Sequence, residues 1–297
     1  MPTNSIRQPN NLSRCPKFLD HYSLLPVGSI DTGLVLKVLE NDQLWTTKSE
    51  TASRLRGRIE SVLAWATVRK YRAGENPAQW TNNLDQVLPA RSKLAKIKNH
   101  PALPFAQISE FIPALRQQAG IASRALEFAI LTATRTNETI GATWQEFDLD
   151  EATWTIPAER MKAEKEHRVP LSNRAMDLVR EMLPLRADEA GPVFPSPKGK
   201  ALSNMAMLAV LKRMKRHDLT VHGFRSTFRD WAGETTAFPR EVVEHGLSHQ
   251  LKDKAEAAYA RGTLFTKRRK LMDAWAAYCN TVKKSEGNNV IPINAAA

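Results

Sequence analysis

Apolar residues recur at helical spacing in the first third of the chain, between positions 31 and 87. The repeat is formed by Ala52, Leu55, Ile59, Val62, Leu63 and Ala66. Positions three and four apart share one face of a helix, so this stripe predicts an amphipathic helix with one buried side. Thr47-Lys-Ser-Glu50 has the form of a capping box, which predicts the start of the helix, and Gly74-Glu-Asn-Pro77 predicts its end.

The rest of the chain alternates between helical and strand-like patterns. Residues 121–132 are strongly apolar and predict a buried helix, whereas the short runs 147–149, 154–156 and 167–170 predict the strands of a small antiparallel sheet. Further helices are expected over residues 173–183 and 204–216, from His222 onwards, and over a last segment whose apolar side is formed by Leu264, Phe265, Leu271, Met272 and Trp275. The pattern therefore predicts a mainly α protein with a small antiparallel β-sheet.

Prolines and basic residues mark the segments between these patterns. Pro2, Pro9 and Pro16 break any period in residues 1–27, so we expect this lead to be disordered. Residues 88–104 have a proline near each end and basic residues at short intervals, which indicates an interdomain linker, although a merely flexible linker can be basic by chance. We expect a helical module over 28–87, a second domain over 105–280 and a disordered tail over 281–297.

Charge and cysteine content narrow the class of protein. The 297 residues carry a formal net charge of +12 and the pI is about 9.8, which fits a protein that neutralises phosphates but fits ribosomal and anionic-membrane partners as well. No stretch approaches the ~20 apolar residues of a membrane span, and no signal peptide opens the chain. Cys15 and Cys279 lie far apart, which argues against a disulfide framework or zinc site and for a reducing cytoplasm.

Candidate chemistry lies in six side chains: Arg135, Lys162, His222, Arg225, His249 and Tyr259. Two guanidinium groups suit the charge that develops on a phosphodiester in its transition state, since they form forked hydrogen bonds. A phenol can attack phosphorus, and an ammonium or imidazole can protonate the leaving oxygen. Each residue alone has a plainer interpretation, as a surface ion pair, a packing residue or part of a solvated turn. Their order and spacing together favour phosphodiester chemistry.

This set resembles the tyrosine recombinase (phage integrase) family, and within it the integrases of satellite-phage and genomic-island type. The matching residues are Arg135 to Glu138 as Arg-x-x-Glu, Lys162 eight residues before Pro170, His222 and Arg225 as His-x-x-Arg, Leu247-Ser248-His249, and Tyr259. Further matches are Trp144-Gln-Glu-Phe-Asp-Leu, the run from Trp154 to Lys162, His167-Arg-Val-Pro-Leu, and the run from Lys267 to Trp275. The resemblance covers residues 28 to 280 and implies a helical core-binding module followed by a tyrosine-recombinase catalytic domain.

The resemblance also implies roles for these side chains. Tyr259 is then the nucleophile that forms a 3′-phosphotyrosine and frees a 5′-hydroxyl, while Arg135 and Arg225 hold the non-bridging oxygens. Lys162 is the expected general acid for the leaving oxygen. No metal or nucleotide cofactor is expected, because the covalent ester conserves the energy of the broken bond.

The imidazoles and one carboxylate complete the implied site. His222 and His249 are expected to hydrogen-bond the phosphate and assist proton transfer, and Glu138 to orient Arg135 without reacting. His245 competes with His249 for its role, but the Leu-Ser-His motif and the distance to the tyrosine favour His249.

The implied partner is double-stranded DNA at attachment sites, bound by a homo-oligomer that is a tetramer on DNA, with DNA-bending accessory proteins and no membrane. DNA-backbone contacts are expected from Arg54, Arg58, Lys93, Lys96 and Lys98, against the plainer interpretation of a solvated basic face. Because the resemblance leaves residues 1–27 outside it, the arm-site-binding domain and the first core-binding helices are expected to be missing. Two rival functions remain open: a type IB topoisomerase-like nicking-closing activity, and a truncated DNA-binding remnant that no longer recombines.

Overall fold

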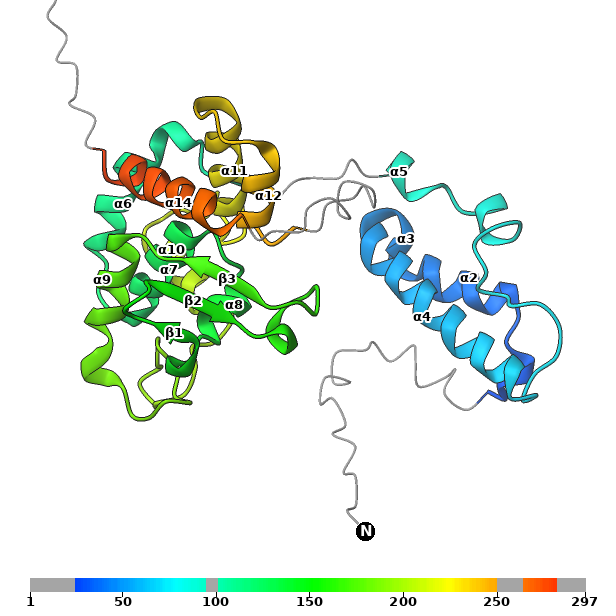
Figure 1. Cartoon of the computed structure of the whole chain (residues 1–297). Helices are drawn as coiled ribbons and strands as arrows, with labels where there is room; N and C mark the ends of the chain where they lie inside the picture. Colours follow the sequence, from blue (N-terminus) through cyan, green and yellow to red (C-terminus); the bar gives the residue numbers. More distant parts are fainter. Residues whose placement is uncertain (1–24, 95–100, 250–263, 282–297) are drawn as a thin grey trace, which may run out of the picture. The chain divides into compact units, whose positions relative to one another are not determined.

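In the computed structural model, the described residues are 25–94, 101–249 and 264–281. The chain divides into two compact units, Met1–Lys98 and Asn99–Ala297, and each unit is described by itself (Figure 1). No helix in the described part of the chain has both the length and the apolar character that crossing a bilayer requires.

The first unit is a small helical module. Its helices are α2 (Thr32–Glu40), α3 (Leu44–Thr47), α4 (Ser49–Val68) and the single turn α5 (Arg91–Leu94). They enclose a core of Val35, Leu39, Trp45, Ala52, Leu63, Ala78, Leu84 and Leu88. Trp45 stacks on Trp80 with a centroid separation of 5.4 Å and donates its indole N–H to the Pro89 carbonyl at 3.0 Å. The two tryptophans therefore attach the segment that follows α4 to the helices that precede it.

Helix α4 differs from its sequence pattern at its start and on one face. The predicted capping box is wrong, because Thr47 closes the preceding α3 and its hydroxyl donates to the Gln43 carbonyl at 2.8 Å instead of accepting from α4. Val62, which was placed on the buried stripe, is 60% exposed, whereas Leu63 and Ala66 are buried as expected. The helix ends at Val68, before the predicted glycine-proline segment.

The second unit combines helices with one small sheet, as predicted. The strands β1 (Phe147–Asp148), β2 (Thr153–Ile156) and β3 (His167–Pro170) pair antiparallel in the order β1-β2-β3, with Phe147 opposite Trp154 and Trp154 opposite Val169. The helices are α6 (Ile108–Arg116), α7 (Ile121–Thr132), α8 (Thr136–Ile140), α9 (Asn173–Glu181), α10 (Ala206–Arg213), α11 (Gly223–Thr235), α12 (Arg240–Gly246) and α14 (Phe265–Asn280). The prediction of a mainly α protein with a small antiparallel sheet is confirmed.

Helix α7 runs through the core of this unit. Residues 125–132 are all buried, as a helix that is apolar on every side requires. Phe128 contacts Trp154 of the sheet at a centroid separation of 5.4 Å, and Trp275 of α14 donates to the Ile130 carbonyl at 2.9 Å. The end of α7 is therefore held by both the sheet and the C-terminal helix.

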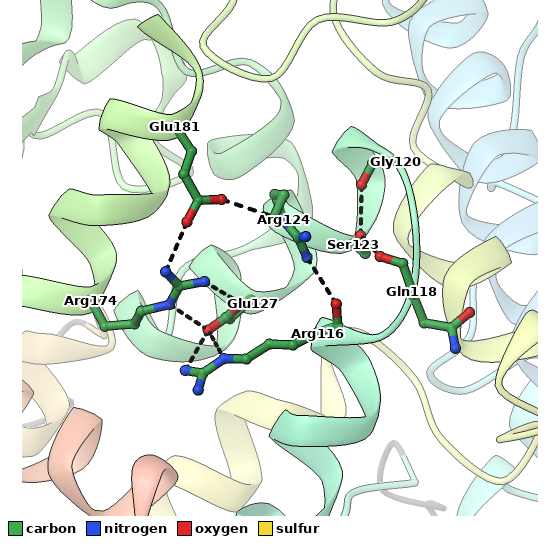
Figure 2. A network of polar contacts seen from close by, with 8 residues as sticks. All are labelled: Arg116, Gln118, Gly120, Ser123, Arg124, Glu127, Arg174 and Glu181. Atoms are coloured by element: carbon green, nitrogen blue, oxygen red, sulfur yellow. Dashed lines mark hydrogen bonds and ion pairs between the residues drawn. The ribbon is translucent and has the colours of Figure 1, made fainter.

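One carboxylate, Glu127, is buried on this helix and is held by two arginines (Figure 2). Arg174 of α9 donates to it from Nε at 2.9 Å and from Nη2 at 3.1 Å, and Arg116 of α6 donates from Nε at 2.8 Å. Burial raises the pKa of Glu127, but the hydrogen bonds and charges of the two arginines outweigh it, so the pKa lies below its usual value. Arg174 also binds Glu181, which contacts Arg124 in turn. The network ties α6, α7 and α9 together behind the end of α7.

The chain passes very close to the start of α11 as it enters this unit. The Pro101 carbonyl accepts hydrogen bonds from the Thr220 amide at 3.3 Å and from its hydroxyl at 3.2 Å, and Thr227 donates to the Leu103 carbonyl at 2.6 Å. A Cβ atom at Gly223 would lie 2.0 Å from the Pro101 oxygen. Position 223 therefore has to be glycine for this crossing to exist.

Candidate active site

Arg135 stands at the junction between α7 and α8. Helix α7 stops at Ala133, whose φ of 51° is left-handed, and Arg135 is the N-cap of α8. The buried Glu138 carboxylate accepts the Arg135 amide at 2.8 Å and its guanidinium at 2.6 Å. One carboxylate therefore fixes both the main chain and the side chain of Arg135, which is the geometry of an orienting group.

Arg225 lies in the first turn of α11, after His222 as the N-cap. Its guanidinium donates to the carbonyls of Ala133 and Leu247, the latter at 2.5 Å, and lies 3.1 Å from His249 Nε2. These contacts use three of the five N–H donors of a guanidinium. The side chain is buried, and burial together with the charge of Arg135 lowers the pKa of Arg225 to about 10, so it remains charged at neutral pH.

His249 is held between Arg225 and Glu244. Its Nδ1 lies 2.6 Å from the Glu244 carboxylate, which in turn accepts from Arg229 Nε at 3.0 Å. A carboxylate only accepts and a guanidinium only donates, so these partners fix the neutral tautomer with the proton on Nδ1 and the lone pair on Nε2. Burial lowers the pKa of His249 despite the opposing effect of Glu244.

The turn formed by residues 247–249, after α12, is the point of convergence. Arg135 Nη2 donates to the Ser248 carbonyl at 3.2 Å, and Arg225 donates to the Leu247 carbonyl. Ser248 has a φ of 51°, and this left-handed turn aims adjacent carbonyls at the two guanidinium groups. Side chains from three separate segments are thus brought together, although Arg135 and Ser248 are 113 residues apart in sequence.

The other predicted site residues are exposed or lie outside the described residues. His222 is exposed at the start of α11, and Lys162 is exposed on the segment between β2 and β3. Tyr259 lies outside the described residues, as do Lys96 and Lys98. In the first unit the remaining predicted basic residues are exposed: Arg54, Arg58 and Lys93.

Two residues near the site had no role in the sequence analysis. Glu244 was missed because its partner, His249, follows it by five positions across the end of α12, a spacing that no simple motif marks. His167 at the start of β3 is buried close to positive charge. Burial, Arg268 and the two arginines of the site lower its pKa to about 3, against a hydrogen bond to the Gly246 backbone. A neutral imidazole therefore packs behind the cations at ordinary pH.

His245, one turn before His249, is the alternative candidate for the phosphate-binding histidine. Burial lowers the pKa of His245, and the positive charge of Arg268 lowers it further. Among the described residues, no group of three or more His, Cys, Asp or Glu side chains is arranged to hold a metal ion. The arrangement that the structure does display is a cluster of fixed cations beside a neutral imidazole, which suits an anion that gains charge during reaction.

Comparison with known proteins gives matches over most of the chain. The sequence profile of the Phage integrase family matches residues 102–263, and that of the Phage integrase central domain matches residues 16–83, starting inside the lead that the resemblance left out. The integrase of Enterobacteria phage P4 is 28% identical over 89% of this chain and 63% of its own length. Prophage integrase IntZ of Escherichia coli is 31% identical over 87% of this chain and 62% of its own length. The chain thus spans under two thirds of either relative.

Solved structures share the fold at low sequence identity. A lambda integrase dimer bound to a COC′ core site matches with a TM-score of 0.56 and 15% identity, over 80% of this chain and 65% of its own. A lambda integrase tetramer bound to a Holliday junction matches with a TM-score of 0.56 and 14% identity, over 76% and 66%.

Proposed function

Because the chain belongs to the phage integrase family, we propose that it is a site-specific DNA recombinase of a mobile genetic element. It cuts and rejoins DNA through a covalent bond between Tyr259 and a 3′-phosphate. The observation that carries this proposal is the convergence of Arg135, Arg225 and His249 on one turn. These are three of the six side chains that the chemistry needs, and they come from distant parts of the sequence.

The proposed reaction follows from the properties of each group. The phenol oxygen of Tyr259 attacks phosphorus and loses its proton, which His222 can accept, as can Nε2 of His249 once it gives up its contact with Arg225. The bond between phosphorus and the 5′-oxygen breaks, and that oxygen takes a proton from Lys162. Arg135 and Arg225 stabilise the charge on the non-bridging oxygens, since planar guanidinium groups match two oxygens at once.

Rigidity of the two arginines supports this assignment. Arg225 is buried and bonded to two main-chain carbonyls, and Arg135 is fixed by Glu138. Groups that are held in place before the substrate arrives need no reorganisation during the reaction, which is where most electrostatic catalysis originates.

We propose that the first unit binds the DNA backbone. Arg58 and Lys93 are exposed, and Arg54 is exposed as well although it donates to Glu50 at 2.8 Å. The basic residues of the connection, Lys96 and Lys98, are assigned to the same function. The lambda integrases of matching fold are bound to DNA as a dimer and as a tetramer, which supports assembly of this chain on double-stranded DNA.

Covalent capture tests the function directly. The substrate is a nicked duplex of the element's attachment core, identified as the direct repeat that flanks the integrated DNA. The full chain should form an SDS-stable adduct with this duplex, and Tyr259→Phe should form none. Chelation should leave the yield unchanged, since the proposed catalytic cations are arginine and lysine side chains.

Four results would count against the proposal. Adduct of unchanged yield in Tyr259→Phe would remove the nucleophile assignment, and strict magnesium dependence would indicate another nuclease chemistry. Binding of the duplex with no adduct in the wild-type chain would favour a DNA-binding remnant. Relaxation of supercoiled plasmids that lack the attachment core would favour nicking-closing activity of the topoisomerase type.

A further inference from the structure

We propose that Arg160 is a positioning residue that fixes the Lys162 segment against α8, and so sets the general acid relative to Arg135. This inference rests on the proposed function, in which Lys162 protonates the leaving oxygen. Arg160 ends a short 3-10 turn, Ala158–Arg160, between β2 and β3, and Lys162 follows two residues later.

Arg160 is anchored on one side by a buried carboxylate. Its Nη1 contacts both oxygens of Glu146, which also accepts the indole N–H of Trp154 at 2.9 Å. The Glu146 side chain is 5% exposed and that of Arg160 is 23% exposed. Trp154 belongs to β2, so the carboxylate links the strand to the turn that follows it.

On its other side Arg160 reaches the main chain of α8. Its Nη2 donates to the Glu138 carbonyl at 2.5 Å and lies 3.5 Å from the Asn137 carbonyl. Glu138 is the same residue whose carboxylate holds Arg135. A continuous path therefore runs from Arg135 through both ends of Glu138 to Arg160 and on to Lys162.

Gly141 at the end of α8 leaves the space for this contact. A Cβ atom there would lie 2.9 Å from Arg160 Nη2 and 3.1 Å from the Asn137 carbonyl. A side chain at 141 would therefore force the guanidinium of Arg160 to shift. Glycine at position 141 therefore leaves the space that the Arg160 guanidinium occupies.

The path matters because proton donation depends steeply on distance. In the proposed step the bond from phosphorus to the 5′-oxygen breaks as Lys162 gives that oxygen its proton, and a displacement of about 1 Å costs on the order of 10²-fold in rate. The arginines act on other oxygens of the same phosphate. If Arg160 determines only the position of Lys162, its replacement should therefore slow only the protonation of the leaving 5′-oxygen.

Replacement of the leaving oxygen by sulfur isolates that step. A thiolate is a far better leaving group than an alkoxide and departs without a proton, so a 5′-bridging phosphorothiolate makes the general acid unnecessary. The experiment measures the rate of adduct formation by the full chain on the nicked duplex, with oxygen or sulfur at the cleaved bond. Arg160→Lys keeps the charge but cannot reach Glu146 and the α8 carbonyl together.

We expect Arg160→Lys to lose on the order of 10²-fold with oxygen and to return to within about threefold of wild type with sulfur. Gly141→Ala should behave in the same way, because it displaces the same guanidinium. The matched control is Arg174→Lys, since Arg174 is also a half-buried arginine (24% exposed) on a buried glutamate, Glu127. Any loss in the control should be equal for both substrates.

An equal loss with oxygen and sulfur in Arg160→Lys would overturn the inference and make the residue merely structural. Lys162→Ala separates this failure from failure of the proposed function. If sulfur rescues Lys162→Ala and not Arg160→Lys, only the inference falls. If the wild-type chain forms no adduct on either substrate, the proposed function itself falls.

Discussion

Replacement of Arg225 by lysine should damage both catalysis and folding, whereas the same change at Arg135 should damage catalysis alone. Arg225 is buried and donates to the carbonyls of Ala133 and Leu247, so its fork joins the end of α7 to the turn after α12. Lysine is a point charge on a flexible stem and cannot bond both carbonyls in that geometry. Arg135 is more exposed, at 24%, and its single main-chain acceptor is 3.2 Å away.

The magnitude follows from the bonds that each change removes. Loss of one hydrogen bond between a charged donor and a buried carbonyl costs about 1.5–3 kcal/mol. For a unit of this size each kcal/mol lowers the melting temperature by about 2–4 °C, so Arg225→Lys should melt about 3–12 °C below wild type. Arg135→Lys should stay within about 4 °C, because a lysine can still pair with Glu138 and the partly exposed contact that is lost, with the Ser248 carbonyl, contributes about 1 kcal/mol or less. Each variant should lose about 30- to 1,000-fold in cleavage, which corresponds to ~2–4 kcal/mol per preorganised donor.

Two measurements on the same preparations test this prediction. Calorimetry of the free protein gives the melting temperature, and adduct formation on the nicked duplex, at a temperature where both variants are folded, gives the rate. Affinity for intact duplex serves as the control and should barely change, because lysine keeps the positive charge on which phosphate binding depends. Arg225→Lys melting with wild type would refute the bridging function of its guanidinium. Cleavage at the wild-type rate by either variant would refute its part in the transition state.

Three further predictions concern packing and protonation. Gly223→Ala should lower the free energy of unfolding by at least about 1–3 kcal/mol, because the added methyl group would meet the Pro101 oxygen. The control is Gly233→Ala on the same helix: its methyl group meets nothing within 4 Å, and the free energy of unfolding should rise by about 0.5–1 kcal/mol. Burial raises the pKa of Glu127, but its arginine partners lower it below 4.5 overall. The stabilisation from the ionised carboxylate is therefore present above pH 4.5 and is lost as the pH falls through the pKa of the folded state. In melting curves recorded at a series of pH values, Glu127→Gln should lose less stability on acidification than the wild type does. The pKa of His249 is depressed below 6.5, so acidification destabilises the fold between pH 6.5 and the folded value. An NMR titration of Glu244→Gln should show a further fall in the pKa of His249, because the hydrogen bond and charge of Glu244 raise it, and a rise would contradict this contact.

Local patterns were enough to predict the parts of the fold that depend on neighbouring residues. The short runs at 147–149, 154–156 and 167–170 predicted the three strands, and the strongly apolar run 121–132 predicted the buried helix α7. The capping box at Thr47 failed for an equally local reason. Its hydroxyl donates to the Gln43 carbonyl, and the sequence does not show whether a threonine hydroxyl will donate to the preceding turn or accept from the helix that follows.

Of the six predicted side chains, the structure brings Arg135, Arg225 and His249 together, and their arrangement could not be predicted. Spacing identified Arg135 and Arg225, yet their acceptors are main-chain carbonyls at 133, 247 and 248, and a carbonyl carries no sequence signal. The same limit hid Arg160, whose contact with Glu138 spans 22 residues and ends on a backbone oxygen. Such contacts follow from the packing of complete helices, which no short motif describes.

The crossing at Pro101 holds the start of the second unit against the turn that precedes α11. Its carbonyl is bonded to Thr220, and Gly223 packs against it without room for a methyl group. The segment that enters the second unit is therefore anchored at the start of α11, the helix that carries Arg225. A substitution at position 101 or 220 is thereby expected to shift Arg225 although neither residue contacts its guanidinium.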